Sequence, residues 1–142
     1  MTTVRHLLDR KGRALFTIEP EDPVLEAIQM MADRHVGALL VMRGTELAGI
    51  VYERDYARKV VLLGRSSAET PVWQIMTTPV ITVSLDKSVQ DCMHIVTERR
   101  IRHLPVMDGR RVVGIISIGD LVKAVIEEQR QTIEQLESYI HS

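Results

Sequence analysis

The feature that most constrains the fold of this chain is an internal repeat. When the 142-residue sequence is shifted by 65 residues, residues 17–60 lie over residues 82–125 without a gap. Eleven of the 44 aligned pairs are identical, including Gly49 with Gly114 and Asp55 with Asp120. A gap-free match that keeps glycines and an aspartate in place indicates that one structural unit has been duplicated.

Each copy predicts the element order β-α-β-β-α. A β-prone run opens each copy, at residues 15–18 and 80–83. Apolar residues at helical spacing then predict an amphipathic helix. They are Val24, Ala27, Ile28 and Met31 in the first copy and Val89, Cys92, Met93 and Val96 in the second. Two apolar runs separated by Gly44 or Gly109 predict a hairpin, and a second helix begins near Asp55 or Asp120.

A single copy is too small to bury much core by itself. We therefore expect an α/β fold in which the two repeats form one intertwined pair. The predicted boundaries are residues 11–60 for the first repeat, 61–75 for a linker, 76–126 for the second repeat and 127–142 for a helical extension.

The last predicted helix is longer than the repeat requires, because residues 119–140 contain no proline and no glycine after Gly119. Apolar positions recur in a 3-4-3-4 spacing, interrupted by one glutamine. Such a stripe packs either on its own domain or against a helix of another chain as a short coiled coil. The stripe consists of Ile126, Gln129, Ile133, Leu136 and Ile140.

Composition narrows the class of protein. The net charge is −1, so no basic excess drives binding to nucleic acid, and no apolar run approaches the 18 residues of a membrane span. The N-terminal residues lack the features of a signal peptide. Cys92 is the only cysteine, which rules out an internal disulfide and favours a reducing cytoplasm. Its place on the apolar helix face predicts a buried core residue rather than a reactive thiol.

The duplicated unit resembles the cystathionine-β-synthase (CBS) domain. The resemblance rests on Met76-Thr77 followed by Thr82-Val83, on RHLPV at 102–106, on GIISIGD at 114–120, and on GIVYERD at 49–55. It covers roughly residues 11–126. The chain looks like a stand-alone CBS pair, also called a Bateman module. The resemblance implies a non-catalytic sensor for signal transduction that binds AMP, ADP, ATP, NAD or S-adenosylmethionine between its repeats, commonly as a homodimer.

The junction at Ser117, Gly119 and Asp120 is the first candidate ligand site. A strand run ends there and a helix begins, so free backbone N–H groups favour a phosphate. The Asp120 carboxylate can accept two hydrogen bonds from a ribose diol, and the Ser117 hydroxyl can bond ribose or phosphate. The alternative is a capping box, with Ser117 as N-cap and Asp120 three residues later.

The equivalent junction of the first copy holds Tyr52 where the second has serine, yet it keeps Asp55. Tyrosine is a poor N-cap, so a carboxylate kept without a capping partner indicates a second role. Together with the resemblance, this predicts ribose binding at both Asp55 and Asp120. Arg54 and Arg58 lie four residues apart on the following helix and either meet phosphates or form a solvated face. Lys11 and Arg13 add two cations before the first strand, with the same two alternatives.

The resemblance implies that the two clefts differ chemically. Arg102 and His103 would face ligand phosphates in one copy, where the other has the small Gly37 and Ala38. By family geometry, adenine at the Asp120 site would lie near Leu15, Phe16, Gly37 and Ala38. Adenine at the Asp55 site would lie near Val80, Ile81 and residues 102–105, which end at Pro105. The alternative for His103 is a plain strand-edge histidine.

Catalytic signatures are absent from the sequence. Neither Gly44-x4-Gly49 nor Gly109-x4-Gly114 is followed by Lys-Ser/Thr, and no metal-binding spacing of histidines or cysteines occurs. We therefore expect no enzyme, no metal and no catalytic cofactor. The leading interpretation is a cytoplasmic, homodimeric sensor of NAD or an adenine nucleotide that signals to an unidentified protein partner. The alternatives are an interaction module with vestigial clefts, a nucleotide-processing enzyme and, least favoured, a nucleic-acid-binding protein.

Overall fold

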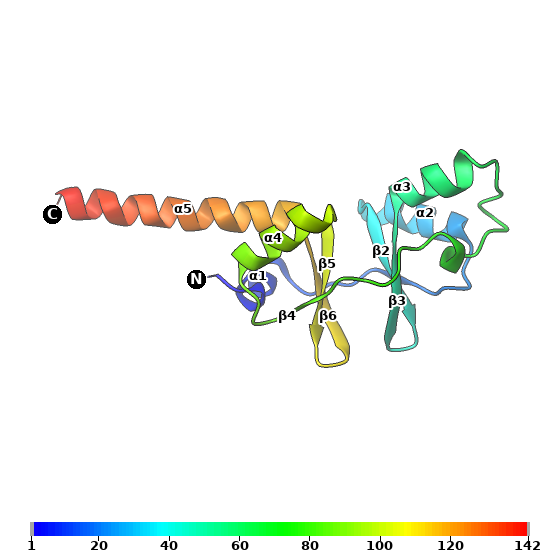
Figure 1. The fold of residues 1–142 in the computed structure, drawn as a ribbon, viewed down its shortest axis with the longest axis horizontal. Coiled ribbons are helices and arrows are strands. Elements are labelled where there is room, and N and C mark those ends of the chain that lie inside the picture. The colour runs from blue at the N-terminus through cyan, green and yellow to red at the C-terminus, as the bar shows by residue number, and fades with distance from the viewer. Residues whose placement is uncertain (1, 142) are drawn as a thin grey trace. The chain divides into compact units, whose positions relative to one another are not determined.

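The computed structural model describes residues 2–141 and contains both copies of the expected β-α-β-β-α unit (Figure 1). The first copy comprises β1 (Thr17–Ile18), α2 (Val24–Arg34), β2 (Ala38–Arg43), β3 (Glu46–Tyr52), α3 (Glu53–Tyr56) and the π-helical turn η1 (Ala57–Val61). The second comprises β4 (Val83–Ser84), α4 (Val89–Arg99), β5 (His103–Asp108), β6 (Arg111–Ser117) and α5 (Ile118–His141). The predicted fold class and element order are therefore confirmed.

Each copy builds a three-stranded sheet of the same topology. β1 pairs parallel with β2, and β2 pairs antiparallel with β3, so that Leu40 lies opposite both Thr17 and Ile50. The second sheet has the order β4-β5-β6, and β4 again pairs parallel with its neighbour. The hairpin turns use Gly44 and Gly109, whose φ angles of 62° and 63° favour glycine. The first strands are shorter than predicted, because only two residues of each lie opposite a neighbouring strand.

The amphipathic helices bury the faces that the spacing predicts. Val24, Ala27 and Met31 are buried on α2, and Val89, Cys92 and Val96 are buried on α4. Pro23 is the N-cap of α2, whereas Ser88 caps α4 by accepting a hydrogen bond from the Asp91 N–H at 3.0 Å. Cys92 is 0% exposed, and burial raises the pKa of its thiol to about 11, which confirms its role as a core residue.

Contacts divide the chain into two units that do not coincide with the two repeats. Unit 1 comprises Met1–Ala14, Thr82–Asp108 and Val113–Ser142, and unit 2 comprises Leu15–Ile81 and Gly109–Val112. The predicted boundaries followed the sequence repeat, whereas these units follow contacts between residues. Residues 76–81 and 109–112 of the predicted second repeat belong to unit 2, and a helix that the sequence analysis did not predict, α1 (Val4–Lys11), belongs to unit 1.

Unit 1 holds the leading segment of the first repeat against the second repeat. The backbone of Thr3 forms an isolated bridge with Ser88, and the Val89 N–H donates to the Thr2 carbonyl at 3.0 Å. Val4 and Leu8 of α1 are completely buried. The start of the chain therefore completes the core of the second repeat.

Unit 2 shows the same arrangement with the roles of the repeats exchanged. Pro71 forms an isolated bridge with Pro23, and the Val24 N–H donates to the Thr70 carbonyl at 2.8 Å. The 3-10 turn η2 (Val72–Gln74) follows, with Val72 and Ile75 completely buried in the core of the first repeat. Each repeat is thus completed by the segment that precedes the other.

The glycine shared by the two copies lies where each leading segment meets a sheet. An added Cβ at Gly114 would lie 2.7 Å from a methyl carbon of Leu8, and one at Gly49 would lie 2.6 Å from the Met76 sulfur. Both distances are too short for a real side chain, so the close approach explains why glycine stands at both positions.

The α5 helix extends well beyond the elements that it packs against in unit 1 (Figure 1). Leu121 is completely buried and Ala124 is 9% exposed, but the stripe from Ile126 onward stays in solvent: Ile126, Ile133, Leu136 and Ile140 are each more than half exposed. Packing of the whole stripe on its own domain is therefore wrong for the described residues. No helix within residues 2–141 combines the length and the apolar character that crossing a bilayer requires.

We predict that Gly114→Ala lowers the free energy of unfolding by about 1–3 kcal/mol, because its Cβ overpacks against the fully buried Leu8. Gly37→Ala is the matched control, since an added Cβ there meets nothing within 4 Å. Urea unfolding of the single variants and of the Leu8→Ala/Gly114→Ala double variant measures the coupling. The explanation predicts that the double variant loses less stability than the two single variants together. Simple additivity would contradict it.

Candidate functional site

The two aspartates of the repeat lie at equivalent strand-to-helix junctions. In unit 1, β6 ends at Ser117 and Asp120 occupies the first turn of α5. In unit 2, β3 ends at Tyr52 and Asp55 occupies the first turn of α3. The preceding loop reaches each junction, because the Ile118 N–H donates to the Arg102 carbonyl at 2.9 Å and the Glu53 N–H donates to the Gly37 carbonyl at 3.0 Å.

Asp120 forms the predicted capping box and also an ion pair. Its Oδ2 accepts a hydrogen bond from the Ser117 N–H at 2.8 Å, and its own N–H donates to Ser117 Oγ at 3.2 Å. The same Oδ2 accepts a hydrogen bond from Lys11 Nζ at 2.5 Å. Lys11 Nζ also donates to the Ile115 carbonyl at 2.7 Å. The carboxylate therefore has a backbone partner within its capping box and a cationic partner from α1 at once.

The surroundings of Asp120 favour its charged form. Partial burial acts to raise its pKa, but the hydrogen bonds from Lys11 and Ser117 and the Lys11 charge outweigh this effect, so the pKa lies below its ordinary value. A lowered pKa means that this carboxylate stabilises the fold above its unfolded-state pKa. That stability is lost as the pH falls through the folded-state pKa.

Both carboxylate oxygens of Asp55 have protein partners, and the residue is more deeply buried than Asp120. Its Oδ2 accepts a hydrogen bond from the Tyr52 N–H at 3.0 Å, and its Oδ1 lies 3.4 Å from Lys59 Nζ. The residue is only 6% exposed. The carboxylate therefore has a capping role without help from a serine, because it bonds the N-cap backbone, and this removes the sequence argument for a second role. Ribose binding by Asp55 stays a prediction.

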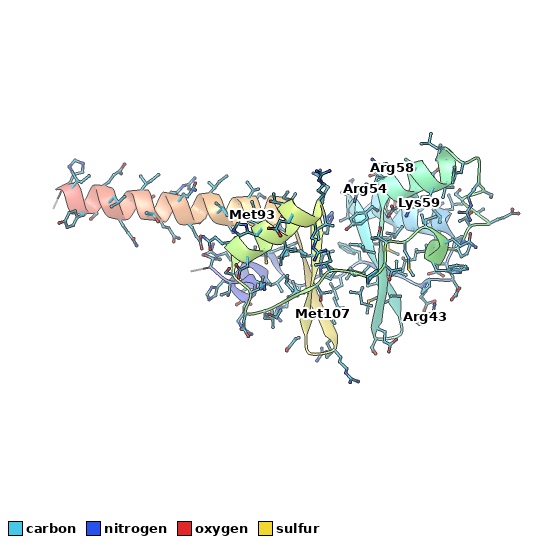
Figure 2. The ribbon with its side chains drawn as sticks, in the orientation of Figure 1. Arg43, Arg54, Arg58, Lys59, Met93 and Met107 are labelled. Carbon is cyan, nitrogen blue, oxygen red and sulfur yellow. The ribbon has the colours of Figure 1, made fainter. Side chains whose placement is uncertain are left out.

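Cations surround the Asp55 junction as the sequence predicted. Arg54, Arg58 and Lys59 project from the segment formed by α3 and η1 (Figure 2). The Arg54 guanidinium lies over the Tyr52 ring, 4.9 Å from its centroid, and Lys59 Nζ donates to the Ile75 carbonyl at 3.0 Å. Burial raises the pKa of Tyr52, so its hydroxyl is neutral. Arg54 and Lys59 thus already have partners within the protein, and phosphate contact by Arg54 and Arg58 stays a prediction.

A cavity of about 370 Å³ opens beside Asp120 within unit 1. Its lining combines three cations with two carboxylates and apolar surface from α1 and α5: Thr2, Leu7, Arg10, Lys11, Asp120, Lys123, Ala124 and Glu127. Such a mixture suits a ligand that carries both an anionic group and hydroxyls. The cavity makes the Asp120 junction the stronger of the two candidate sites.

The remaining predicted residues divide between the units. Gly119, Arg102, His103 and Pro105 belong to unit 1 with Asp120, whereas Leu15, Phe16, Gly37, Ala38, Val80 and Ile81 belong to unit 2 with Asp55. The predicted adenine pockets each combine residues of both units and stay predictions. Within unit 2, Leu15 and Phe16 line a cavity of about 470 Å³, where the Arg34 guanidinium lies 5.3 Å from the Phe16 ring centroid.

Sequence reasoning did not predict the pairing of Lys11 with Asp120. It treated Lys11 as part of a loop before the first strand, but Lys11 is the last residue of α1. The signal was present in the spacing of Val4, Leu7 and Leu8, which is helical and amphipathic. Arg10 and Lys123 were also missed as cavity-lining residues. Within the described part of the chain, no cluster of three metal-ligating side chains occurs.

Comparison with known proteins places this geometry in a family. The model of the CBS domain matches residues 4–62 and 72–127. The CBS domain-containing protein CBSX3, mitochondrial, of Arabidopsis thaliana is 39% identical over 148 residues, which cover 98% of this chain and 72% of that protein.

Solved structures agree with this assignment. A protein with CBS domains from Burkholderia ambifaria is 52% identical, with a TM-score of 0.85 over 90% of this chain and 96% of that one. The CBS domain pair of protein MJ0100, solved with 5′-methylthioadenosine and S-adenosyl-L-methionine, is 25% identical, with a TM-score of 0.79 over 90% of this chain and 98% of that one. Two matches to the family model, a duplicated fold and these relatives lead to one conclusion: the chain belongs to the CBS domain family and carries a pair of CBS domains.

Proposed function

We propose that this CBS pair is a non-catalytic sensor that binds NAD, AMP, ADP or ATP at the Asp120 junction. The observation that carries the proposal is a carboxylate in the first turn of a long helix, beside a cavity lined by Arg10, Lys11 and Lys123. A carboxylate can hold a ribose diol, and the cations and the first-turn N–H groups can hold phosphate. The MJ0100 pair supports the adenosine part, because it was solved with two adenosine-containing ligands.

The Asp120 junction is a better binding site than its counterpart in unit 2. The Asp120 side chain is 20% exposed, and the two hydrogen bonds described above that its carboxylate accepts both use Oδ2. Asp55 is buried, and both of its oxygens face partners. A ligand at Asp55 must first break the contacts of a buried carboxylate with the Tyr52 N–H and Lys59. This costs more free energy than displacing one lysine from a partly exposed carboxylate.

Signalling requires that the ligand favours one arrangement of the protein over another. The Asp120 junction is suited to this, because α5 begins there and carries an exposed apolar stripe farther along the same helix. A ligand that changes the first turn of α5 acts on the element that we expect to contact another chain. An unidentified protein partner would read the change. The single cysteine, free and buried, supports a reducing cytoplasm as the place of action.

Calorimetric titration of nucleotide-free protein with NAD, AMP, ADP and ATP tests the sensor function. We expect saturable binding of at least one of them. Asp120→Asn should weaken it by about tenfold or more, because it removes charge-assisted hydrogen bonds to the ribose. Asp55→Asn is the matched control and should leave affinity within about twofold. Absence of binding to all four ligands would favour an interaction module instead, and equal loss in both variants would contradict the choice of Asp120.

Homodimerisation through α5 is the second part of the proposal. Ile133, Leu136 and Ile140 repeat at coiled-coil spacing and are 55%, 58% and 73% exposed. An antiparallel pairing centred between residues 134 and 135 sets Ile133 against Leu136 of the second copy. In the same register, Arg130 flanks the seam within two residues of the level of Glu137 of the second copy, twice by symmetry. Apolar layers and opposite charges therefore agree on one register.

Light scattering coupled to gel filtration tests this dimer. The wild type should have about twice the 16.1 kDa mass of one chain, and Ile133→Glu should shift it toward the monomer, because it buries a charge in the apolar layer. Gln131→Glu adds the same charge on the opposite helix face and should leave the mass unchanged. A monomeric wild type, or an Ile133→Glu variant that keeps the wild-type mass, would contradict the proposal.

A further inference from the structure

Lys11 is held in a position from which it can exchange partners. It is the last residue of α1, and Gly12 follows with a φ of 98° while its N–H donates to the Leu8 carbonyl at 2.7 Å. This arrangement ends the helix sharply and fixes the Lys11 backbone beside the cavity. The ammonium sits on a flexible four-carbon chain, and the side chain as a whole is 35% exposed. The position of the side chain is therefore set by its partners, Asp120 and the Ile115 carbonyl.

The charges around the cavity leave Lys11 as the cation closest to the carboxylate. The cavity lining carries Arg10, Lys11 and Lys123 against Asp120 and Glu127, an excess of one positive charge. When a ribose diol bonds the Asp120 carboxylate, the Lys11 ammonium loses its anionic acceptor and keeps only the Ile115 carbonyl. A partly buried ammonium without a counter-charge is unfavourable, so the bound ligand must offer a new anionic acceptor.

We infer that Lys11 changes partner from Asp120 to a ligand phosphate on binding and so selects for phosphorylated nucleotides; we call this exchange the latch. The inference rests on the proposed function of the Asp120 junction. In the empty site, the ammonium occupies Oδ2, one of the two carboxylate oxygens that a ribose diol uses. In the bound state, it moves to a ligand phosphate, where an ion pair replaces the one that was broken. A nucleoside without phosphate must displace Lys11 and offers no such replacement.

The positive charge of the cavity lining should make affinity for adenosine-containing ligands depend on the charge at the ribose 5′ position. AMP, ADP, ATP and NAD all carry an anionic group attached to the ribose 5′ position. Adenosine and 5′-methylthioadenosine carry none, and S-adenosylmethionine places a positively charged sulfonium there. Because the lining has an excess of cations, this site should bind the phosphorylated ligands best and the sulfonium worst.

Affinities for AMP and adenosine, measured by calorimetry in wild type and Lys11→Met, test the latch. The ratio of the adenosine Kd to the AMP Kd should fall by about tenfold in the variant, because the phosphate loses its ion pair. Adenosine itself should bind about threefold tighter, because nothing competes for Asp120. Arg13→Met is the matched control: it removes a nearby cation whose partner is Asp9, and should leave the ratio unchanged. Lys11→Arg should restore the preference for AMP.

Failure of the latch and failure of the sensor function give different results. If AMP and adenosine bind and Asp120→Asn weakens both, but Lys11→Met leaves their ratio unchanged, the latch is wrong and the site stands. An equal drop in the ratio for Arg13→Met would also overturn the latch, since a general loss of charge would explain it. If the wild type binds none of NAD, AMP, ADP and ATP, the proposed function and the latch fail together.

The empty-state contact has a test that needs no ligand. NMR titration of the Asp120 carboxyl should give a pKa below the ordinary value of an aspartate in the wild type, because Lys11 and Ser117 stabilise its charged form. The pKa should move upward in Lys11→Met, because the variant loses a hydrogen bond and a positive charge beside the carboxylate. Lys59→Met removes the corresponding lysine at Asp55 and should not move the Asp120 titration. An unchanged Asp120 pKa in Lys11→Met would overturn the latch.

Discussion

Each sheet of this protein depends on the segment that precedes the other repeat. The Thr3–Ser88 bridge and the Pro23–Pro71 bridge are the same contact made twice, once in each unit. Behind them, Leu8 and Ile75 are completely buried against sheets that lie far from them in sequence. A repeat without its neighbour's leading segment would expose an apolar surface that only this exchange covers. The burial of both sheets therefore requires both repeats.

The exchange also determines what reaches each candidate site. Because α1 packs in unit 1, its last residue, Lys11, lies at Asp120, 109 positions away in sequence. The corresponding lysine at Asp55 comes instead from the same helical segment, four residues later. Duplicated backbones thus carry unlike electrostatics: one carboxylate is buried with a local partner, and the other borders a cavity and has a remote partner. This asymmetry is the reason to assign ligand binding to a single junction.

The sequence predicted the features that occur in both repeats and depend on neighbouring residues. It did not predict contacts that occur once and join residues far apart in the chain. Helical spacing around Val24 and Val89, and glycines at the hairpin turns, are signals within one segment, and both were confirmed. The Asp120 junction was recognised because serine and aspartate stand at capping distance. The pairing of Lys11 with Asp120 was missed, since shifting Lys11 by one repeat leads to Met76, so that duplication gave no second example. The deeper burial of Asp55 compared with Asp120 was also missed, because it depends on tertiary packing.

The reciprocal placement of the leading segments has a consequence for the origin of the chain. A protein made of one such repeat would lack its own completing segment and would have to take it from a second molecule. Two molecules could satisfy each other in this way, as a domain-swapped dimer does. Joining them end to end replaces a concentration-dependent association with an intramolecular one, for which the effective concentration of the partner is far higher. Gene fusion would then have preserved an existing exchange rather than created a new fold.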